Sequence, residues 1–182
     1  ARQRRSVSSI VPKSEAAFAD YLHFGGMPSL FSLREQSIEN ISRELSSIMD
    51  TVVLNDTARH LKLRDISLLQ RLIAYLFSST GNLFSTNKVV GVLKSSGRTT
   101  SSETVDSYID ALEKAYVLSE TQQTGLQGKK LLAPLRKFYP VDQGLLNLTT
   151  RFSSENTGLQ LENVVHNELV RRGYTIEVGT LR

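Results

Sequence analysis

The pattern that most constrains the fold of this chain is a series of three predicted helices between Asp65 and Asp142, each with apolar residues at helical spacing. In Ile66–Ser79 the apolar residues recur every three or four positions, which is typical of a helix with one buried face. Thr86–Ser96 shows the same spacing over a shorter stretch and stops at Gly97. Thr100–Glu103 has the sequence of a capping box, so we expect a third helix that the threonine caps and the glutamate supports.

Two extended runs follow the third helix, Tyr116–Thr124 and Lys129–Val141, and Gly125–Gly128 separates them. Three helices followed by a β-hairpin is the order of a winged helix-turn-helix, in which the hairpin is the wing. The turn is not a phosphate-binding loop, because its spacing differs from a Walker A motif and no helix follows it. We therefore predict a wing with Lys129 and Lys130 at its tip.

Helices are also predicted on the N-terminal side, in residues 1–64. A short helix over Ser14–Leu22 would bury an apolar side formed by Ala17, Phe18, Tyr21 and Leu22. The glycines and the proline of His23–Pro28 end that helix. Apolar residues then recur from Leu33 to about Leu63, which predicts an amphipathic helix that packs on the winged helix and breaks near Asn55.

The C-terminal side begins with a turn into a short helix at Asp142–Leu146, followed by a polar loop at Ser153–Thr157. Leu159–Arg172 is predicted as the last helix and Gly173 as its left-handed stop. Its apolar positions are Leu161, Val164, Val165, Leu169 and Val170. Tyr174–Val178 then alternates like a strand.

These elements predict a mainly α fold with three parts. Residues 1–64 form a helical segment, and residues 65–152 form the winged helix-turn-helix with its β-hairpin wing. A helix that leads into a strand is a change of class, so we place a boundary near Phe152. Residues 153–182 then begin a further α/β domain.

Composition excludes several kinds of function. With 40% apolar and 22% charged residues, the chain has the composition of a globular protein. It contains no cysteine, which excludes disulfides, thiolate metal ligands and cysteine nucleophiles. No apolar run approaches the roughly 20 residues that cross a bilayer, and the N-terminus lacks the apolar core of a signal peptide. We therefore expect a cytoplasmic protein without membrane contact.

A winged helix that binds DNA uses the start of its third helix, the turn before it and the wing. The net charge of +4 and the pI of about 9.4 are compatible with nucleic acid. Hydroxyl and basic side chains suit phosphate oxygens, and the candidates are Arg98, Thr99, Thr100, Ser101, Ser102, Thr104, Lys129, Lys130, Arg136 and Lys137. The third helix also carries acids that repel phosphate: Glu103, Asp106, Asp110 and Glu113.

Glu162 and His166 lie one turn apart on the last helix, with Asn163 beside them. Their spacing alone favours a solvated helix face. His23 and His60 have no partner that the sequence identifies, so we predict no catalytic triad and no complete metal site.

Five segments in a fixed order resemble a known family. They are Phe18–Pro28, Val53–Asp56, Thr104–Leu112, Arg136–Leu145 and Gly158–Tyr174. In this order they resemble the C-terminal region of a large group of prokaryotic AAA-type ATPases. In that group a P-loop domain is followed by a domain of unknown function and then by a restriction-endonuclease-like domain.

The resemblance implies that an ATPase core, which uses ATP and Mg²⁺, lies upstream of Ala1, whereas this fragment itself holds no cofactor. It also implies that Leu159–Gly179 is the first helix and strand of the nuclease-like domain. In such a domain a glutamate of this helix helps to hold Mg²⁺, and Glu162 matches its position. The remaining ligands would follow Arg182, so this fragment would not be an enzyme by itself.

Two functions remain open from the sequence. The winged helix would bind DNA through its wing and the start of its third helix, as part of an ATP-driven protein. Alternatively, the helices and winged helix would dock onto the ATPase core, another subunit or another copy of the protein, without contacting DNA. The acidic third helix is compatible with the second function.

Overall fold

A computed structural model describes residues 15–51, 58, 65–123, 135–152 and 157–179. This part of the chain is mainly helical and contains one small antiparallel sheet of two strands. The elements are α1 (Glu15–Phe24), the 3-10 helix η2 (Pro28–Ser32), α2 (Ile38–Ile48), α4 (Ile66–Ser78), α5 (Thr86–Ser95), α6 (Ser102–Lys114), β1 (Leu118–Gln122), β2 (Arg136–Pro140), α7 (Gln143–Thr149) and α8 (Thr157–Arg171).

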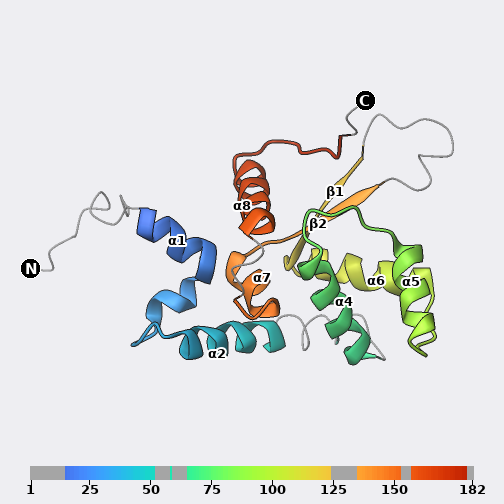
Figure 1. Cartoon of the computed structure of the whole chain (residues 1–182), viewed down its shortest axis with the longest axis horizontal. Coiled ribbons are helices and arrows are strands. Elements are labelled where there is room, and N and C mark those ends of the chain that lie inside the picture. Colours follow the sequence, from blue (N-terminus) through green and yellow to red (C-terminus); the bar gives the residue numbers. More distant parts are fainter. Residues whose placement is uncertain (1–14, 52–57, 59–64, 124–134, 153–156, 180–182) are drawn as a thin grey trace, which may run out of the picture.

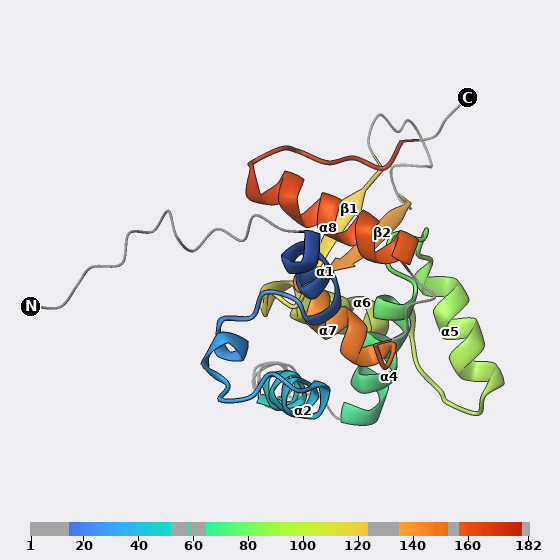
Figure 2. The same ribbon diagram turned by 60° about the vertical axis from the view of Figure 1, so that its left-hand side comes forward.

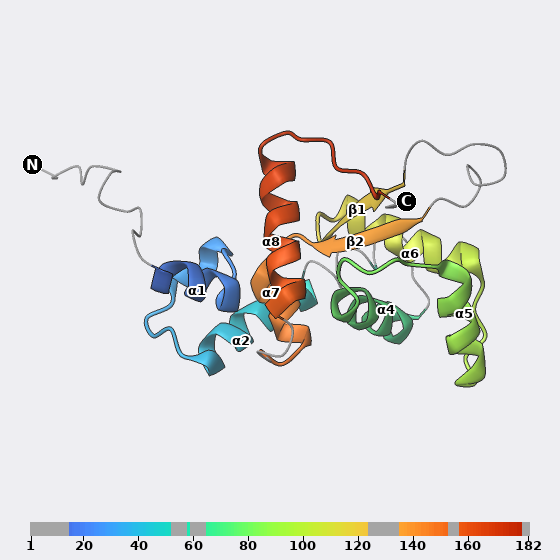
Figure 3. The same ribbon diagram turned by 45° about the horizontal axis from the view of Figure 1, so that its top comes forward.

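The short helix α7 lies in the middle of the molecule. It contacts α1 and α2 on one side and α4, β2 and α8 on the others. Figure 1 and Figure 3 show α1 and α2 on one side of α7, and the sheet with α4, α5 and α6 on the opposite side. Figure 2 shows α8 lying across the end of α7 and beside the two strands. The position of α7 therefore joins the N-terminal helices to the rest of the fold.

The helix α4 confirms the prediction for Ile66–Ser79 closely. Asp65 caps it, and its carboxylate accepts a hydrogen bond from the backbone N–H of Leu68 at 2.9 Å. The inward residues are all apolar and nearly inaccessible to solvent: Leu68, Leu69, Leu72, Ile73, Leu76 and Phe77. Together with residues of α2, α5, α6, α7 and the sheet they form one core. α4 is the main core helix of the described fold.

The helices α5 and α6 also lie where the sequence predicted them, but the cap of α6 differs. Ser101 caps α6 and accepts a hydrogen bond from the N–H of Thr104 at 3.2 Å, so the prediction of Thr100 as the cap is wrong. The Thr100 hydroxyl is instead buried and makes no hydrogen bond within the described residues. Gly97, with a left-handed φ of 82°, ends the turn after α5 as expected.

The two strands pair in antiparallel fashion, from Leu118 opposite Pro140 to Gln122 opposite Arg136. A further isolated antiparallel bridge joins Phe84, in the segment between α4 and α5, to Arg136. β1 is shorter than the predicted Tyr116–Thr124, and of the second predicted run residues 129–134 lie outside the described residues. The predicted wing tip, with Lys129 and Lys130, lies outside the described residues.

The N-terminal helices differ from the prediction in two ways. α2 begins after Ser37, whose hydroxyl accepts from the N–H of Asn40, and not at Leu33. The reason is that Leu33 is extended and ends η2, so the helix starts again at a new cap. α1 has no fully buried residue, although an apolar side was predicted, and Phe18 is 49% exposed. Its neighbours α7 and α8 cover it only in part.

The last helix, α8, confirms the predicted position and ends at Gly173, which has a left-handed φ of 81°. The strand predicted at Tyr174–Val178 is reduced to one parallel bridge between Val178 and Gln123. No helix in the described residues is both long and apolar enough to span a membrane.

Candidate functional site

Arg98, predicted to contact DNA, lies in the turn before α6 and reaches back to the start of α4. Its Nη1 is 3.3 Å from Asp65 Oδ2 and donates to Ser67 Oγ at 2.9 Å. The side chain is 33% exposed. This guanidinium therefore ties the turn to the cap of α4, and a phosphate would have to compete with Asp65 for it.

Most hydroxyls at the start of α6 also have partners inside the chain. Ser101 caps the helix, and Thr104 Oγ1 lies 3.2 Å from the Ser101 hydroxyl. Ser102 donates to Asn87 Oδ1 at 3.1 Å and so links α6 to α5. Thr99 is exposed. The structure thus brings these predicted residues together, but as a cap and a helix–helix contact.

Arg136 is the most strongly engaged of the predicted DNA contacts. Its Nη2 donates to Thr86 Oγ1 at 2.6 Å and to Asp106 Oδ1 at 2.7 Å, while Nη1 lies 3.5 Å from Glu120 Oε2. The guanidinium lies over the rings of Phe84 and Phe138, at 5.4 and 5.5 Å from their centroids. Since the side chain is only 20% exposed, Arg136 holds α5, α6 and the sheet together and does not present its charge to solvent.

Lys137 and Glu162, predicted for two different sites, bind each other. Lys137 Nζ lies 3.1 Å from Glu162 Oε1, and the Tyr139 hydroxyl donates to the same oxygen at 2.9 Å. Burial, together with the nearby Glu162 carboxylate, raises the pKa of Tyr139, so the hydroxyl remains a donor at neutral pH. Gly81 makes room for this carboxylate, because a Cβ there would lie 2.6 Å from Glu162 Oε1.

Within the described residues Glu162 has no further metal ligand beside it, and its role in holding Mg²⁺ stays a prediction, because the remaining ligands were expected after Arg182. Among the described residues, no three His, Asp or Glu side chains lie close enough together to hold a metal ion. The neighbours of the carboxylate are a lysine and a tyrosine, whereas Mg²⁺ needs several oxygen ligands in an octahedral arrangement. Glu162 therefore serves as the link between α8 and β2 in this chain.

His166 is buried, which corrects the expectation of a solvated helix face. Its ring stacks on Tyr139, with centroids 3.7 Å apart and planes within 9°. Nε2 lies 2.9 Å from Thr121 Oγ1, and Nδ1 lies 3.3 Å from Asn167 Oδ1. Since the Asn167 amide group donates to the Pro140 carbonyl, its Oδ1 is left to accept from Nδ1–H. The neutral ring satisfies all these contacts, and burial lowers the pKa of His166.

Four carboxamides form the centre of the contact between α7 and α8: Gln143, Asn147, Gln160 and Asn163. Asn147 donates from Nδ2 to the carbonyls of Leu22 and His23 at 2.7 and 2.8 Å, and its Oδ1 accepts from Gln160 at 2.8 Å. Asn163, also buried, donates to Gln143 Oε1 at 3.0 Å. The buried amides of α8 therefore have hydrogen-bond partners on α7, and Asn147 of α7 in turn binds two carbonyls of α1.

Asp142 lies beside these carboxamides, next to the end of α1. We call Asp142 together with Gln143, Asn147, Gln160 and Asn163 the polar junction. Its carboxylate accepts hydrogen bonds from the N–H groups of Gly26 and Gly144, both at 2.8 Å, and of Leu145 at 3.2 Å. Burial raises its pKa, and the three N–H donors act in the opposite direction. A Cβ at Gly25 would lie 2.3 Å from Asp142 Oδ1, so only glycine fits there, and its φ of 80° also requires it.

The outward side of α8 is apolar. Leu161 is 42% exposed and Val165 is 57% exposed, and the half-buried Leu169 follows at the same helical spacing. Nearby Tyr174 is 62% exposed. The helix thus buries amides and a histidine and leaves Leu161, Val165 and Val170 exposed, whereas an ordinary surface helix buries its apolar residues and exposes its polar ones.

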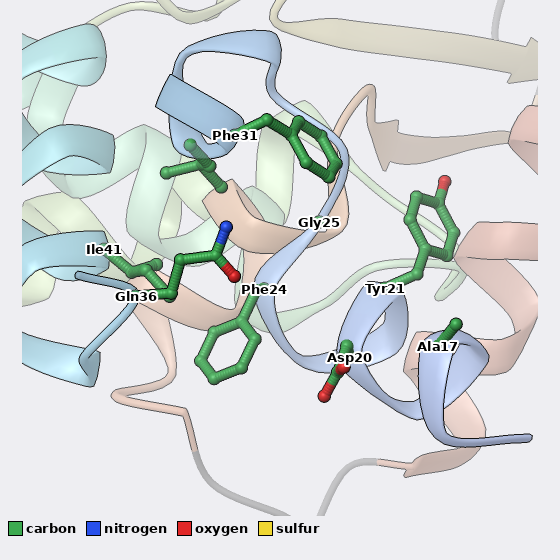
Figure 4. A pocket seen from close by; sticks show the side chains of 9 residues that line it. Ala17, Asp20, Tyr21, Phe24, Gly25, Phe31, Gln36 and Ile41 are labelled. Carbon is green, nitrogen blue, oxygen red and sulfur yellow. The ribbon is translucent and has the colours of Figure 1, made fainter. Parts of the chain in front are cut away.

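A cavity of about 380 Å³ lies on the other side of the molecule, between α1, η2 and α2. Figure 4 shows side chains from all three elements around it, with Phe24, Phe31 and Ile41 among its apolar walls and Asp20 on the α1 side. Phe31 is 73% exposed. Among the described residues, this hollow and the outward side of α8 are two of the places where apolar side chains remain exposed.

Comparison with known proteins identifies the family. A family described as a domain of unknown function (DUF8612) matches residues 15–156. The chain belongs to this family. An uncharacterized protein of Haemophilus influenzae is 35% identical over 164 residues, which cover 90% of this chain and 40% of that protein. An uncharacterized protein of Methanocaldococcus jannaschii is 28% identical over 156 residues, which cover 85% of this chain and 34% of that protein.

These curated relatives are therefore much longer than the DUF8612 chain, which spans 40% and 34% of their lengths. The family match ends at residue 156, immediately before α8. No solved structure matches the chain.

Proposed function

We propose that this DUF8612 chain is a docking region of a longer AAA-type ATPase. Five segments resemble the C-terminal region of such ATPases, and both relatives extend well beyond the matched region. Three of these segments, Phe18–Pro28, Arg136–Leu145 and Gly158–Tyr174, meet at the polar junction of Asp142. In the proposed parent protein, ATP and Mg²⁺ bind to another domain. This region packs against other parts of the protein and takes no part in ATP hydrolysis.

The observation that carries the proposal is the exposure of apolar side chains on α8, whose polar side chains are buried. An isolated aliphatic residue on a surface is ordinary, but Leu161, Val165 and Leu169 form one line along a helix whose polar side is buried. We assign this line as the surface on which the next part of the longer polypeptide packs, in the way that the first helix of a nuclease-like domain would pack on its sheet.

We further propose that α4 to β2 form a winged helix. The helix order is that of the motif, and the bridge between Phe84 and Arg136 adds a third extended segment beside β2, between the first two helices of the unit. Arg136 then links the start of the second helix, the third helix and both strands. The ion pairs of Arg98, Arg136 and Lys137 favour a docking role over a DNA-binding one.

The docking role is tested by replacing Leu161 and Val165 together with glutamine, in the longer protein and in the 182-residue chain. Glutamine keeps helix propensity while removing apolar area. We expect the thermal midpoint of the longer protein to fall by several degrees and that of the short chain to change by about a degree or less. Equal shifts in both proteins would contradict the proposal.

DNA binding is a second function and stays a prediction, because the wing-tip lysines lie outside the described residues. It is supported by the exposed Thr99 beside the start of α6. The double substitution Lys129→Ala, Lys130→Ala, compared with the unchanged chain in a salt titration with duplex DNA, tests it: loss of phosphate contacts would reduce the salt dependence of binding.

A further inference from the structure

We propose that the cavity between α1, η2 and α2 binds a cationic segment of a partner protein that carries one apolar anchor side chain. The inference is independent of the proposed role of α8, since the two surfaces involve different elements. It rests on the shape of the cavity, on the exposed Phe31 side chain that lines it and on the charge of these helices.

The cavity has a fixed floor. Leu30 and Ile41 line it and are 5% and 2% exposed, because both also belong to the main core. Gly25, which lines it too, is pressed against the Asp142 carboxylate and held in a left-handed conformation. These walls cannot collapse into the hollow without disturbing the core or the polar junction. The cavity is thus preformed, as binding pockets usually are.

The mouth of the cavity is unusually apolar for a free surface. Phe31, which lines it, is 73% exposed. Figure 4 shows the Phe31 ring at the edge of the hollow, on the η2 side. A large exposed aromatic side chain at the edge of an apolar hollow is typical of a protein-binding site.

The negative charge of these helices favours a cationic partner. Although the chain has a net charge of +4, residues 15–50 contain six acidic residues and two arginines. Asp20 lines the cavity, and Glu35 and Glu39 lie on either side of Gln36 in sequence, at the α2 edge. All three acids are exposed, and within the described residues none of them has an ion pair. The nearest base in sequence is Arg34.

The size of the cavity indicates how much of the partner can enter it. A volume of about 380 Å³ accommodates one large aliphatic or aromatic side chain and part of its backbone, and not a whole domain surface. The expected partner is therefore a short segment with a leucine or phenylalanine that enters the cavity and with lysine or arginine residues that lie over Asp20 and the α2 edge.

The test is a titration of the 182-residue chain with two peptides, followed by ¹H–¹⁵N NMR. The first is acetyl-Lys-Arg-Phe-Leu-Arg-Lys-amide, and the second replaces its four bases with Glu and Asp. We expect the cationic peptide to shift the backbone signals of Asp20 and Gln36 in a saturable way, with binding that weakens as salt increases. Equal binding of the acidic peptide, or no saturable shift at these residues, would overturn the proposal.

Two matched pairs of variants locate the contact. Ala17 lines the cavity, whereas Ala16 next to it on α1 is exposed. We expect Ala17→Leu to fill the hollow and weaken binding of the cationic peptide by about tenfold, and Ala16→Leu to leave it unchanged. Likewise Asp20→Asn should weaken binding and Asp110→Asn, on α6, should not. Spectra that retain the dispersed signals of the unchanged chain show that each variant is folded; unaltered binding by Ala17→Leu would contradict the assigned site.

Discussion

The helices α4 and α8 meet the rest of the molecule in opposite ways. α4 turns six apolar side chains inward and leaves its polar residues in solvent, whereas α8 turns Gln160, Asn163 and His166 inward and leaves Leu161 and Val165 exposed. α4 is therefore stabilised by burial of apolar surface, and α8 by directed hydrogen bonds to α7, β1 and β2. This difference is the basis of the proposal that α8 packs on a further partner through its outward side, whereas the inward side of α4 is already covered within the chain.

The largest expected effect is the difference in stability between replacing a leucine of α4 and replacing a leucine of α8. Leu69 on α4 is fully buried, whereas Leu161 on α8 is 42% exposed. We expect Leu69→Ala to lower the free energy of unfolding by about 3–5 kcal/mol, because it removes buried methyl groups and leaves a cavity. Leu161→Ala should change it by about 0.5 kcal/mol or less. Urea denaturation followed by circular dichroism measures both, and similar losses would mean that α8 packs on this chain through its apolar side.

A smaller loss of unfolding free energy is expected when a hydrogen-bond partner of the polar side of α8 is removed. Asn147→Ala removes the partner of the Gln160 amide and of two α1 carbonyls, all in a buried site. Leaving such groups without hydrogen bonds should lower the free energy of unfolding by about 2–3 kcal/mol. The exposed Asn87, which accepts from Ser102, provides the control, since Asn87→Ala should cost well under that amount. If both substitutions had the same effect, the buried amides would not be what holds α8.

The smallest effect is the dependence on pH that His166 introduces. Burial lowers its pKa in the folded protein below the value of 6.5 expected in the unfolded chain. The unfolded state therefore binds this proton more readily, so stability is complete above about pH 7 and decreases as the pH falls through 6.5 toward the folded pKa.

The variant His166→Gln isolates this contribution, because Asp142, whose pKa is raised, is common to both proteins. We expect the thermal midpoint of the unchanged chain to fall more between pH 7.5 and pH 5.5 than that of the variant. Parallel pH profiles would show that the folded protein accommodates the charged ring.

Much of the helical fold is predictable because its core helices follow a simple rule. The apolar period of α4 and the glycine after α5 locate these elements to within about a residue, since one buried face dictates the spacing. The cap of α6 was misplaced by one residue because Thr100 and Ser101 are equally suitable caps in the sequence. The outcome depends on which hydroxyl the turn brings to the N–H of Thr104.

The polar junction was not predictable in the same way. Asp142 and Gln160 lie in segments that resemble the ATPase family, but the resemblance does not say what they bind, and their contacts with Gly26 and Asn147 join residues more than ten positions apart. The apolar residues of α8 gave a misleading signal, because periodicity shows which face is apolar and not where its partner lies. One signal was available: Gly25 and Gly144 lie within two of the segments that resemble the ATPase family, and a side chain at either glycine would collide with the backbone or with Asp142.

The central claim, that the outward side of α8 is covered in the longer protein, is open to a direct measurement. The chain has no cysteine, so Val165→Cys introduces a unique thiol at a position that is 57% exposed here. Val92→Cys, at a valine of α5 that is 67% exposed, serves as the control. Maleimide labelling of each site is followed by peptide mass spectrometry in the 182-residue chain and in the longer protein. We predict rapid labelling of both sites in the short chain and selective protection of position 165 in the longer protein. Equal labelling rates at position 165 in the two proteins would contradict the account.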